Sequence, residues 1–246
     1  MPSPVDRPSP NFDSRPAGAP VDILLLHYTG MPSAEAALAR LCDPDAKVSA
    51  HYLVDEDGTV CRLVDEDRRA WHAGVARWAG ESDVNGRSIG IELVNPGHEF
   101  GYRPFPEAQM AALEELAGDL VARHAIPPAR VLGHSDVAPA RRCDPGELFD
   151  WARLAAAGIG LWPAAGIEAP ASEERLGPGS EGAAVAALQR GLARFGYDID
   201  VGGRYDGATG IVVRAFQRHF RPRLVDGVAD AETRALLARL VAAAGA

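Results

Sequence analysis

Hydrophobic positions follow a strand-like pattern in three stretches of the first two thirds of the chain. A continuous apolar run over 21–27, VDILLLH, is typical of a buried central strand that ends in a histidine. In residues 88–94, SIGIELV, large apolar residues alternate with small or polar ones and β-branched side chains are frequent, which predicts a strand that carries Glu92. The apolar pair at 131–132 predicts a short strand just before His134.

Helical spacing appears between these strands. Ser33 followed by AEAALARL predicts an N-capped helix, and apolar residues recur at helical spacing over 106–123. Residues 51–60 predict a hairpin that closes at Asp57-Gly58. The order β, α, β, β, β, α, β therefore predicts an α/β fold, a mixed central sheet with helices on its faces.

The last third of the chain has a different pattern. A stretch at about 161–172 has no period and is typical of a linker. Three segments with helical spacing follow, separated by Gly and Asp turns, at 183–195, 207–220 and 231–244. We predict a small three-helix domain here. The predicted boundaries are 1–163 for the first domain, 164–174 for the linker and 175–246 for the three-helix domain.

Length and charge exclude several classes of protein. A chain of 246 residues is long enough for one large or two modest domains. No apolar run approaches the roughly 20 residues that are needed to span a bilayer. The net charge of −9 argues against binding to nucleic acid, which requires clustered Lys and Arg. We therefore expect no membrane segment and no nucleic-acid partner. We also expect the protein to be a monomer.

Three side chains that can bind a metal fall at or after the ends of predicted strands: His27, His134 and Asp144. Two imidazoles and one carboxylate leave a fourth tetrahedral position open for water, as a catalytic zinc site requires. Zinc would lower the pKa of that water towards ~7. Spacing alone does not distinguish this trio from surface or capping residues, because the chain has seven histidines.

Five motifs of the first domain resemble the type-2 N-acetylmuramoyl-L-alanine amidase family. They are, in the family's order, HYTG (27–30), SAHYLVDEDGTV (49–60), AWHAG (70–74), SIGIELVNPG (88–97) and GHSDVAPARRCDPG (133–146). The resemblance implies a fold like that of the peptidoglycan-recognition proteins. It implies zinc held by His27, His134 and Asp144, with Glu92 as the catalytic carboxylate. The implied reaction is hydrolysis of the amide between N-acetylmuramic acid, or its 1,6-anhydro form, and L-alanine of peptidoglycan fragments, in cell-wall recycling or turnover.

Glu92 is expected to accept a proton from the attacking water and to pass one to the leaving nitrogen.

One residue near the implied third ligand departs from the family pattern. Similar enzymes usually have a lysine two residues before the third ligand, where this chain has Arg142. Since the pKa of arginine lies above ~12, Arg142 is assigned to electrostatic stabilisation only. Cys143 is an alternative third ligand, because thiolates bind zinc, but Asp144 with its following Pro-Gly pair fits the resemblance better.

Four further residues are candidates for substrate contact: His51, Trp71, His72 and Asn85. Either histidine can instead support a ligand imidazole or be a structural residue. Trp71 and Trp78 offer an aromatic wall for a sugar ring, and packing in the core is the alternative for both.

The last part of the chain has a resemblance of its own. Segments 180–197, 205–220 and 225–240 resemble the peptidoglycan-binding-1 domain, a three-helix module that docks on cell-wall polymer. The alternative is a bundle that only stabilises the amidase. Two other functions stay open: a non-catalytic recognition protein with this fold, and a hydrolase that cuts an amide of the stem peptide.

The expected location rests on the start of the chain. Residues 1–20 are rich in proline and lack the apolar segment of a secretory leader. The three cysteines, Cys42, Cys61 and Cys143, lack the spacing of a disulfide framework, which allows a reducing compartment. We expect a cytoplasmic enzyme of muropeptide recycling. A wall-binding domain favours the alternative, the periplasm or cell envelope.

Overall fold

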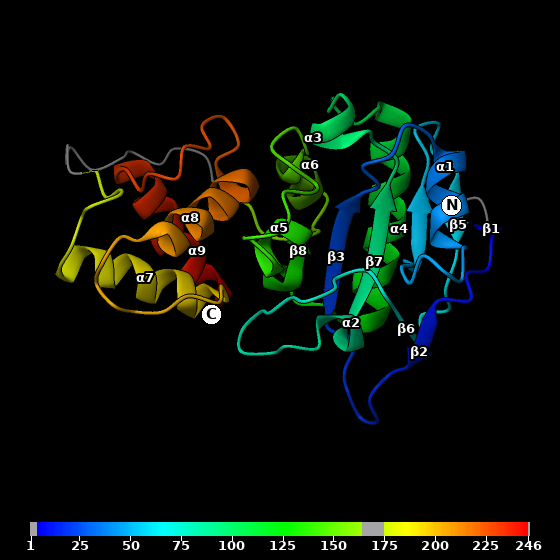
Figure 1. The fold of residues 1–246 in the computed structure, drawn as a ribbon, viewed down its shortest axis with the longest axis horizontal. Coiled ribbons are helices and arrows are strands. Elements are labelled where there is room, and N and C mark those ends of the chain that lie inside the picture. The colour runs from blue at the N-terminus through cyan, green and yellow to red at the C-terminus, as the bar shows by residue number, and fades with distance from the viewer. Residues whose placement is uncertain (1–3, 164–174, 246) are drawn as a thin grey trace.

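The computed structural model describes residues 4–163 and 175–245, so the predicted linker, 164–174, lies outside the described residues. An α/β body surrounds a mixed sheet, and three further helices lie against one side of it (Figure 1). The predicted fold class is confirmed. No helix within the described ranges is long and apolar enough to cross a membrane.

A six-stranded sheet forms the centre of the α/β body, in the order β1-β5-β4-β7-β3-β8. Its strands are β1 (Val5–Asp6), β3 (Ile23–Tyr28), β4 (Tyr52–Val54), β5 (Val60–Arg62), β7 (Ser88–Leu93) and β8 (Val131–Gly133). Strands β4 and β5 form the predicted antiparallel hairpin. Strand β3 lies between β7 and β8 and is parallel to both. The carboxyl ends of these three strands therefore meet at one edge of the sheet.

The side chains of β3 and β7 divide between the two faces of the sheet. Leu26 and Ile91 belong to the core that α4 (Glu107–His124) covers on one face. Because side chains alternate along a strand, the next residues, His27 and Glu92, point to the opposite face. These two residues are also register partners on adjacent strands. The sheet thus places both on one face at its carboxyl edge.

Several short elements escaped prediction from the sequence. The proline-rich start contributes β1, which pairs with β5, and β2 (Phe12–Ser14), which pairs with β6 (Arg68–Ala70) in a separate two-stranded sheet. The unpredicted helices are α2 (Val84–Arg87), α3 (Gly97–Phe100), η1 (Pro128–Arg130), α5 (His134–Val137) and α6 (Trp151–Ala156). Segments this short leave no detectable periodicity. The predicted N-capped helix is α1 (Ala34–Leu41), whose cap is Ser33.

The three helices of the C-terminal region coincide with the predicted segments: α7 (Ala183–Phe195), α8 (Gly207–Phe220) and α9 (Ala231–Ala244). Asp206 and Asp230 cap α8 and α9, because each carboxylate accepts a hydrogen bond from the backbone N–H three residues later. The apolar core of these helices is continuous with side chains of the α/β body, among them Leu25 and Trp78. Helix α8 lies beside α5, next to β8 at the sheet edge (Figure 1).

Candidate metal and active site

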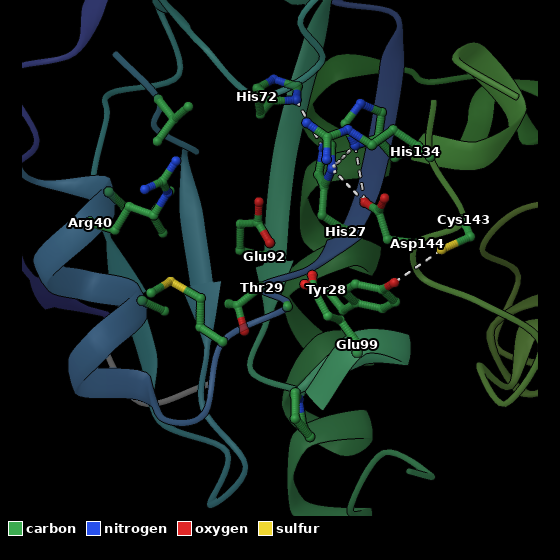
Figure 2. Close-up of a pocket in the computed structure, with 18 of the residues that line it drawn as sticks. His27, Tyr28, Thr29, Arg40, His72, Glu92, Glu99, His134, Cys143 and Asp144 are labelled. Carbon is green, nitrogen blue, oxygen red and sulfur yellow. Dashed lines mark hydrogen bonds and ion pairs between the residues drawn. The ribbon is translucent and has the colours of Figure 1, made fainter. Parts of the chain in front are cut away.

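Two histidines and an aspartate meet at the carboxyl edge of the sheet, and all three are buried. His27 lies on β3, His134 begins α5 directly after β8, and Asp144 lies in the loop that follows α5. The Nδ1 atom of His27 is 2.9 Å from Nδ1 of His134 and 3.1 Å from Oδ2 of Asp144. The Nδ1 atom of His134 is 3.0 Å from the same oxygen (Figure 2). Two nitrogens and one oxygen thus converge on one point, a donor set that fits a zinc ion.

The outer nitrogen of each imidazole has a partner within the protein. Nε2 of His134 donates to the carbonyl oxygen of Ala73 at 3.0 Å. Nε2 of His27 lies 3.1 Å from Nδ1 of His72, whose own Nε2 lies 3.3 Å from the hydroxyl oxygen of Ser88. Such partners fix the orientation of a ligand imidazole and leave its other nitrogen to face the metal.

His72 fits against β7 only because residue 90 is a glycine. A Cβ atom at Gly90 would lie 2.5 Å from Cγ of His72, closer than any ordinary contact. Burial lowers the pKa of His72 well below its usual value, and the neighbouring His27 adds to this effect. Burial also lowers the pKa of His27 to about 4, with a contribution from His134. The imidazole of His27 is therefore neutral at pH 7, as metal binding requires.

Asp144 is ionised although it is buried. Burial by itself would raise the pKa of this carboxyl, but His134 and His27 lower it far below the usual range. A carboxylate and neutral imidazoles are the ligand forms that bind a divalent metal.

Cys143 points away from the cluster of His27, His134 and Asp144. Its sulfur lies 3.1 Å from the hydroxyl oxygen of Tyr28 and 3.5 Å from Nδ1 of His98 (Figure 2). Among the described residues, the cluster capable of holding a metal contains Asp144 and leaves out Cys143. This geometry favours Asp144 over its neighbour as the third donor.

A cavity of about 310 Å³ opens above the cluster, and Glu92 on β7 lies in its wall (Figure 2). Oε2 of Glu92 is buried and has no hydrogen-bond partner within the described parts of the chain. Burial raises the pKa of Glu92 well above its usual value, the charge of Asp144 raises it further, and Arg142 opposes both. An unpaired carboxyl with a raised pKa beside a metal site is suited to proton transfer.

Two adjacent arginines border the cavity and differ in their contacts. Arg141 donates to the carbonyl oxygens of Ala73 and Val75, so it holds the loop that His134 also contacts. Arg142 is exposed and lines the same cavity. Its charge is therefore available to a molecule that enters the cavity.

Two of the four substrate candidates are enclosed by the protein. Nδ1 of His51 accepts a hydrogen bond from the backbone of Gly90 at 2.9 Å, and its Nε2 lies 3.1 Å from a backbone carbonyl oxygen. The side-chain oxygen of Asn85 accepts from the backbone N–H groups of His72 and Ala73. Neither His51 nor Asn85 lines the cavity, so the structure does not support a substrate contact for either.

Of the two tryptophans in the region of the AWHAG motif, one lines the cavity and the other is buried in the core. Trp71 lines the cavity, and its indole N–H donates to Asp13 at 2.7 Å. Trp78 is 2% exposed and packs edge-on against Phe195 and Tyr197. Trp71 is therefore placed where it can contact a molecule in the cavity, whereas Trp78 packs in the core.

Sequence reasoning missed Arg40 and Ser88. Arg40 comes from α1 and lines the wall of the cavity opposite the cluster of His27, His134 and Asp144 (Figure 2). Ser88 begins β7 and contacts His72 from within the protein. Arg40 lies outside the five motifs, and Ser88 begins one of them without any sign that its side chain contacts His72, because both contacts depend on the packing of separate elements.

A buried His-His-Asp cluster, an open cavity and an unpaired carboxyl on an α/β sheet define a hydrolase with a candidate metal site. Residues 17–147 match the family model for N-acetylmuramoyl-L-alanine amidase, and residues 181–237 match the model for a peptidoglycan binding domain. The chain belongs to the N-acetylmuramoyl-L-alanine amidase family. This membership confirms the predicted enzyme class and the predicted kind of C-terminal domain.

Individual relatives cover most of the chain. The N-acetylmuramoyl-L-alanine amidase AmiD of Escherichia coli is 40% identical over an alignment of 241 positions that covers 90% of this chain and 82% of AmiD. A solved complex of E. coli AmiD with anhydro-N-acetylmuramic acid-L-Ala-D-γ-Glu-L-Lys has a TM-score of 0.81 at 39% identity, covering 95% of this chain and 93% of that one. AmpDh3 of Pseudomonas aeruginosa in complex with anhydromuramic pentapeptide has a TM-score of 0.77 at 33% identity, covering 92% and 93%.

Proposed function

We propose that this amidase uses zinc to hydrolyse the amide between N-acetylmuramic acid, in its ordinary or 1,6-anhydro form, and L-alanine of peptidoglycan fragments. The observation that carries the proposal is the convergence of His27, His134 and Asp144 below a cavity whose wall contains the unpaired carboxyl of Glu92. The similarity to AmiD and AmpDh3 supports the choice of substrate, because the structures of both contain anhydromuramic peptides.

We assign the metal to Nδ1 of His27, Nδ1 of His134 and the carboxylate of Asp144. Zinc, when bound, supplies Lewis-acid chemistry that lowers the pKa of water and polarises a carbonyl group. His72 and the carbonyl oxygen of Ala73 hold the two imidazoles in place through their outer nitrogens.

Proton transfer falls to Glu92. Its carboxylate accepts a proton from the attacking water and delivers one to the nitrogen of L-alanine as the amide breaks. The raised pKa of Glu92 favours the second transfer, because the protonated form persists closer to neutral pH. Arg142 stabilises the negative charge that develops on the scissile carbonyl oxygen and donates no proton.

The setting of the reaction is a further part of this proposal. We propose that the domain at 175–246 contacts cell-wall polymer, that the protein is a monomer and that it recycles muropeptides in the cytoplasm. Sedimentation with insoluble sacculi, size measurement in solution and fractionation of the native host test these three statements.

The test of the reaction is mass spectrometry of products from an anhydro-muropeptide, with and without chelator. We expect free anhydro-N-acetylmuramic acid and a peptide with a new L-alanine amino terminus, formed only when metal is present and restored by added zinc. A product that keeps the sugar on a shortened peptide would indicate a stem-peptide endopeptidase instead. Unchanged substrate with zinc bound would refute the proposal.

A further inference from the structure

Asp136 is a buried carboxylate at the junction of the α/β body and the C-terminal helices. It lies on α5, two residues after His134, and is 1% exposed. Its Oδ1 accepts the hydroxyl of Tyr197 at 2.6 Å, and its Oδ2 lies 2.7 Å from Nδ1 of His219. Both partners belong to the C-terminal region, so this region supplies two of the groups that satisfy the carboxylate.

The same carboxylate holds the backbone that carries a metal donor. Oδ2 of Asp136 also accepts the N–H of Gly133 at 2.8 Å, the residue just before His134. Ser135, which lies between His134 and Asp136 in the chain, donates its N–H to the carbonyl oxygen of Asp144 at 2.9 Å. The turn of α5 therefore contacts the C-terminal helices through Asp136. The same turn carries His134 and is hydrogen-bonded to the backbone of Asp144.

The surroundings of this contact are closely packed. The ring of His219 is stacked between Trp151 and Phe220, with ring centroids 3.7 and 3.8 Å away. Nearby, a Cβ atom at Gly196 would lie 2.4 Å from the indole of Trp78, so the helix end fits closely around that ring. The C-terminal helices are packed against the body and cannot shift without disturbing α5.

Burial makes the contacts of Asp136 important. A buried carboxylate that loses a donor bears the full cost of desolvation, and the structure around it rearranges to recover a partner. Burial and the nearby Asp136 raise the pKa of Tyr197 well above its usual value, which keeps its hydroxyl a donor. Because the N–H of Gly133 donates to the same carboxylate, a rearrangement of Asp136 would displace the turn that follows Gly133.

We propose that the C-terminal helical region positions the metal site: Tyr197 and His219 hold Asp136, and Asp136 holds the turn that presents His134. This inference rests on the proposed zinc site. It gives the C-terminal region a task inside the catalytic body in addition to any contact with cell-wall polymer. Tyr197, His219 and Asp136 are positioning residues, because none of them lines the cavity.

The test compares two tyrosines that are alike in exposure and in the length of their hydrogen bonds but differ in the acceptor, a carboxylate for Tyr197 and a backbone carbonyl for Tyr205. Tyr197 and Tyr205 are each 3% exposed, and each hydroxyl donates one hydrogen bond of 2.6 Å. The hydroxyl of Tyr205 ends on the carbonyl oxygen of Gly227, inside the C-terminal region. Tyr197→Phe and Tyr205→Phe therefore each remove one buried hydroxyl and its hydrogen bond, and only the first removes a donor from Asp136.

The measurement is zinc affinity of the full-length protein, by competition with a chromogenic chelator. We expect Tyr197→Phe and Asp136→Asn to weaken zinc binding about 10-fold, the lower end of the range found for groups that orient metal ligands, because both loosen the turn that presents His134. Tyr205→Phe should stay within about twofold of wild type. A purely structural role would lower the unfolding midpoint of either Phe variant and leave the zinc affinity of both unchanged.

Wild-type affinity in folded Tyr197→Phe would overturn the inference. If that variant does not fold, His219→Gln serves as the second variant, with the same expectation and the same refuting result. The proposed function is judged separately: a wild-type protein that binds zinc but leaves muropeptides intact refutes the function alone, and a wild-type protein that binds no zinc refutes both.

Discussion

The orientation of His27 depends on two side chains that lie behind it on one face of the sheet. His72 contacts the outer nitrogen of His27, and Ser88 contacts the outer nitrogen of His72. His72 borders the cavity as well, so the sequence alternatives of substrate contact and support for a ligand are both compatible with its position. The 3.1 Å contact to His27 is the observation that favours support.

The role proposed for Glu92 predicts a change in rate without a change in metal content. Glu92→Gln keeps the shape of the side chain but cannot accept a proton, so kcat/KM should fall about 100-fold or more. Zinc content, measured by atomic absorption, should equal that of wild type. Glu35→Gln, at an exposed carboxyl of α1 outside this cavity, is the matched control and should keep the wild-type rate. A Glu92→Gln enzyme at nearly full rate would exclude Glu92 as the base.

The raised pKa of Glu92 also predicts a pH-dependent difference in stability of the metal-free protein. The pKa is ordinary, about 4.3, in the unfolded chain and well above that in the folded protein. The folded state therefore binds the proton more tightly, and this stabilisation, complete below about pH 4, is lost as the pH rises through the folded pKa. Glu92→Gln has no such loss.

Thermal unfolding in the presence of chelator measures this difference. The midpoint of Glu92→Gln minus that of wild type should be larger at pH 8 than at pH 4. Since every other titrating group is shared, its contribution cancels in the comparison. A difference that is the same at both pH values would mean that the carboxyl of Glu92 is not desolvated.

At the scale of elements, strand β7 serves the core on one face and the site on the other. Ile89 and Ile91 pack under α4, whereas Gly90 and Glu92 face the cluster side, where Gly90 leaves the space for His72. The alternation of SIGIELV predicted the strand and the placement of Glu92. The purpose of the glycine within it became apparent only with the imidazole of His72 in place.

A pair of Gly→Ala substitutions tests how element context decides the effect of one methyl group. Gly90→Ala places a Cβ atom 2.5 Å from a ring atom of His72, so we expect a loss of about 1–3 kcal/mol in the free energy of unfolding. Gly118→Ala, within α4, meets nothing closer than 3.7 Å and should stabilise the protein by about 0.5–1 kcal/mol. Urea titration measures both. Equal effects at the two positions would contradict the close packing of His72 against β7.

At the scale of the whole molecule, the two regions share one apolar core. Side chains from β3, β8 and the segment around Trp78 pack with those of α7, α8 and α9. Trp78 makes edge-on ring contacts to both Phe195 and Tyr197. A C-terminal domain attached in this way is a fixed part of the enzyme.

Shared packing predicts cooperative unfolding. Calorimetry of the full chain should show a single transition whose calorimetric and van't Hoff enthalpies agree. Trp78→Ala removes a large buried ring, which typically costs about 3–5 kcal/mol, and should lower the midpoint of that whole transition. Phe100→Ala, at a side chain 59% exposed, is the control and should change it little. Two separate transitions in the wild-type protein would show that the regions unfold independently.

Periodicity along the chain was sufficient for the long elements. The helical segments at 183–195, 207–220 and 231–244 match α7, α8 and α9, because an amphipathic helix of three or more turns repeats its apolar face several times. Strand-end positions and the family motifs together pointed to His27 and His134, since parallel strands end at one edge of a sheet. These features are local, so the sequence by itself determined them.

Tertiary structure alone decided which way the remaining side chains point and what they contact. The sequence does not distinguish His51 from His72. In the structure, His51 is enclosed by backbone groups, whereas His72 contacts the outer nitrogen of His27. His134 and Asp136 are two residues apart on one turn, and they contact Asp144 and the C-terminal helices respectively. Each outcome depends on contacts between segments far apart in the chain, and such contacts exist only after the elements have packed.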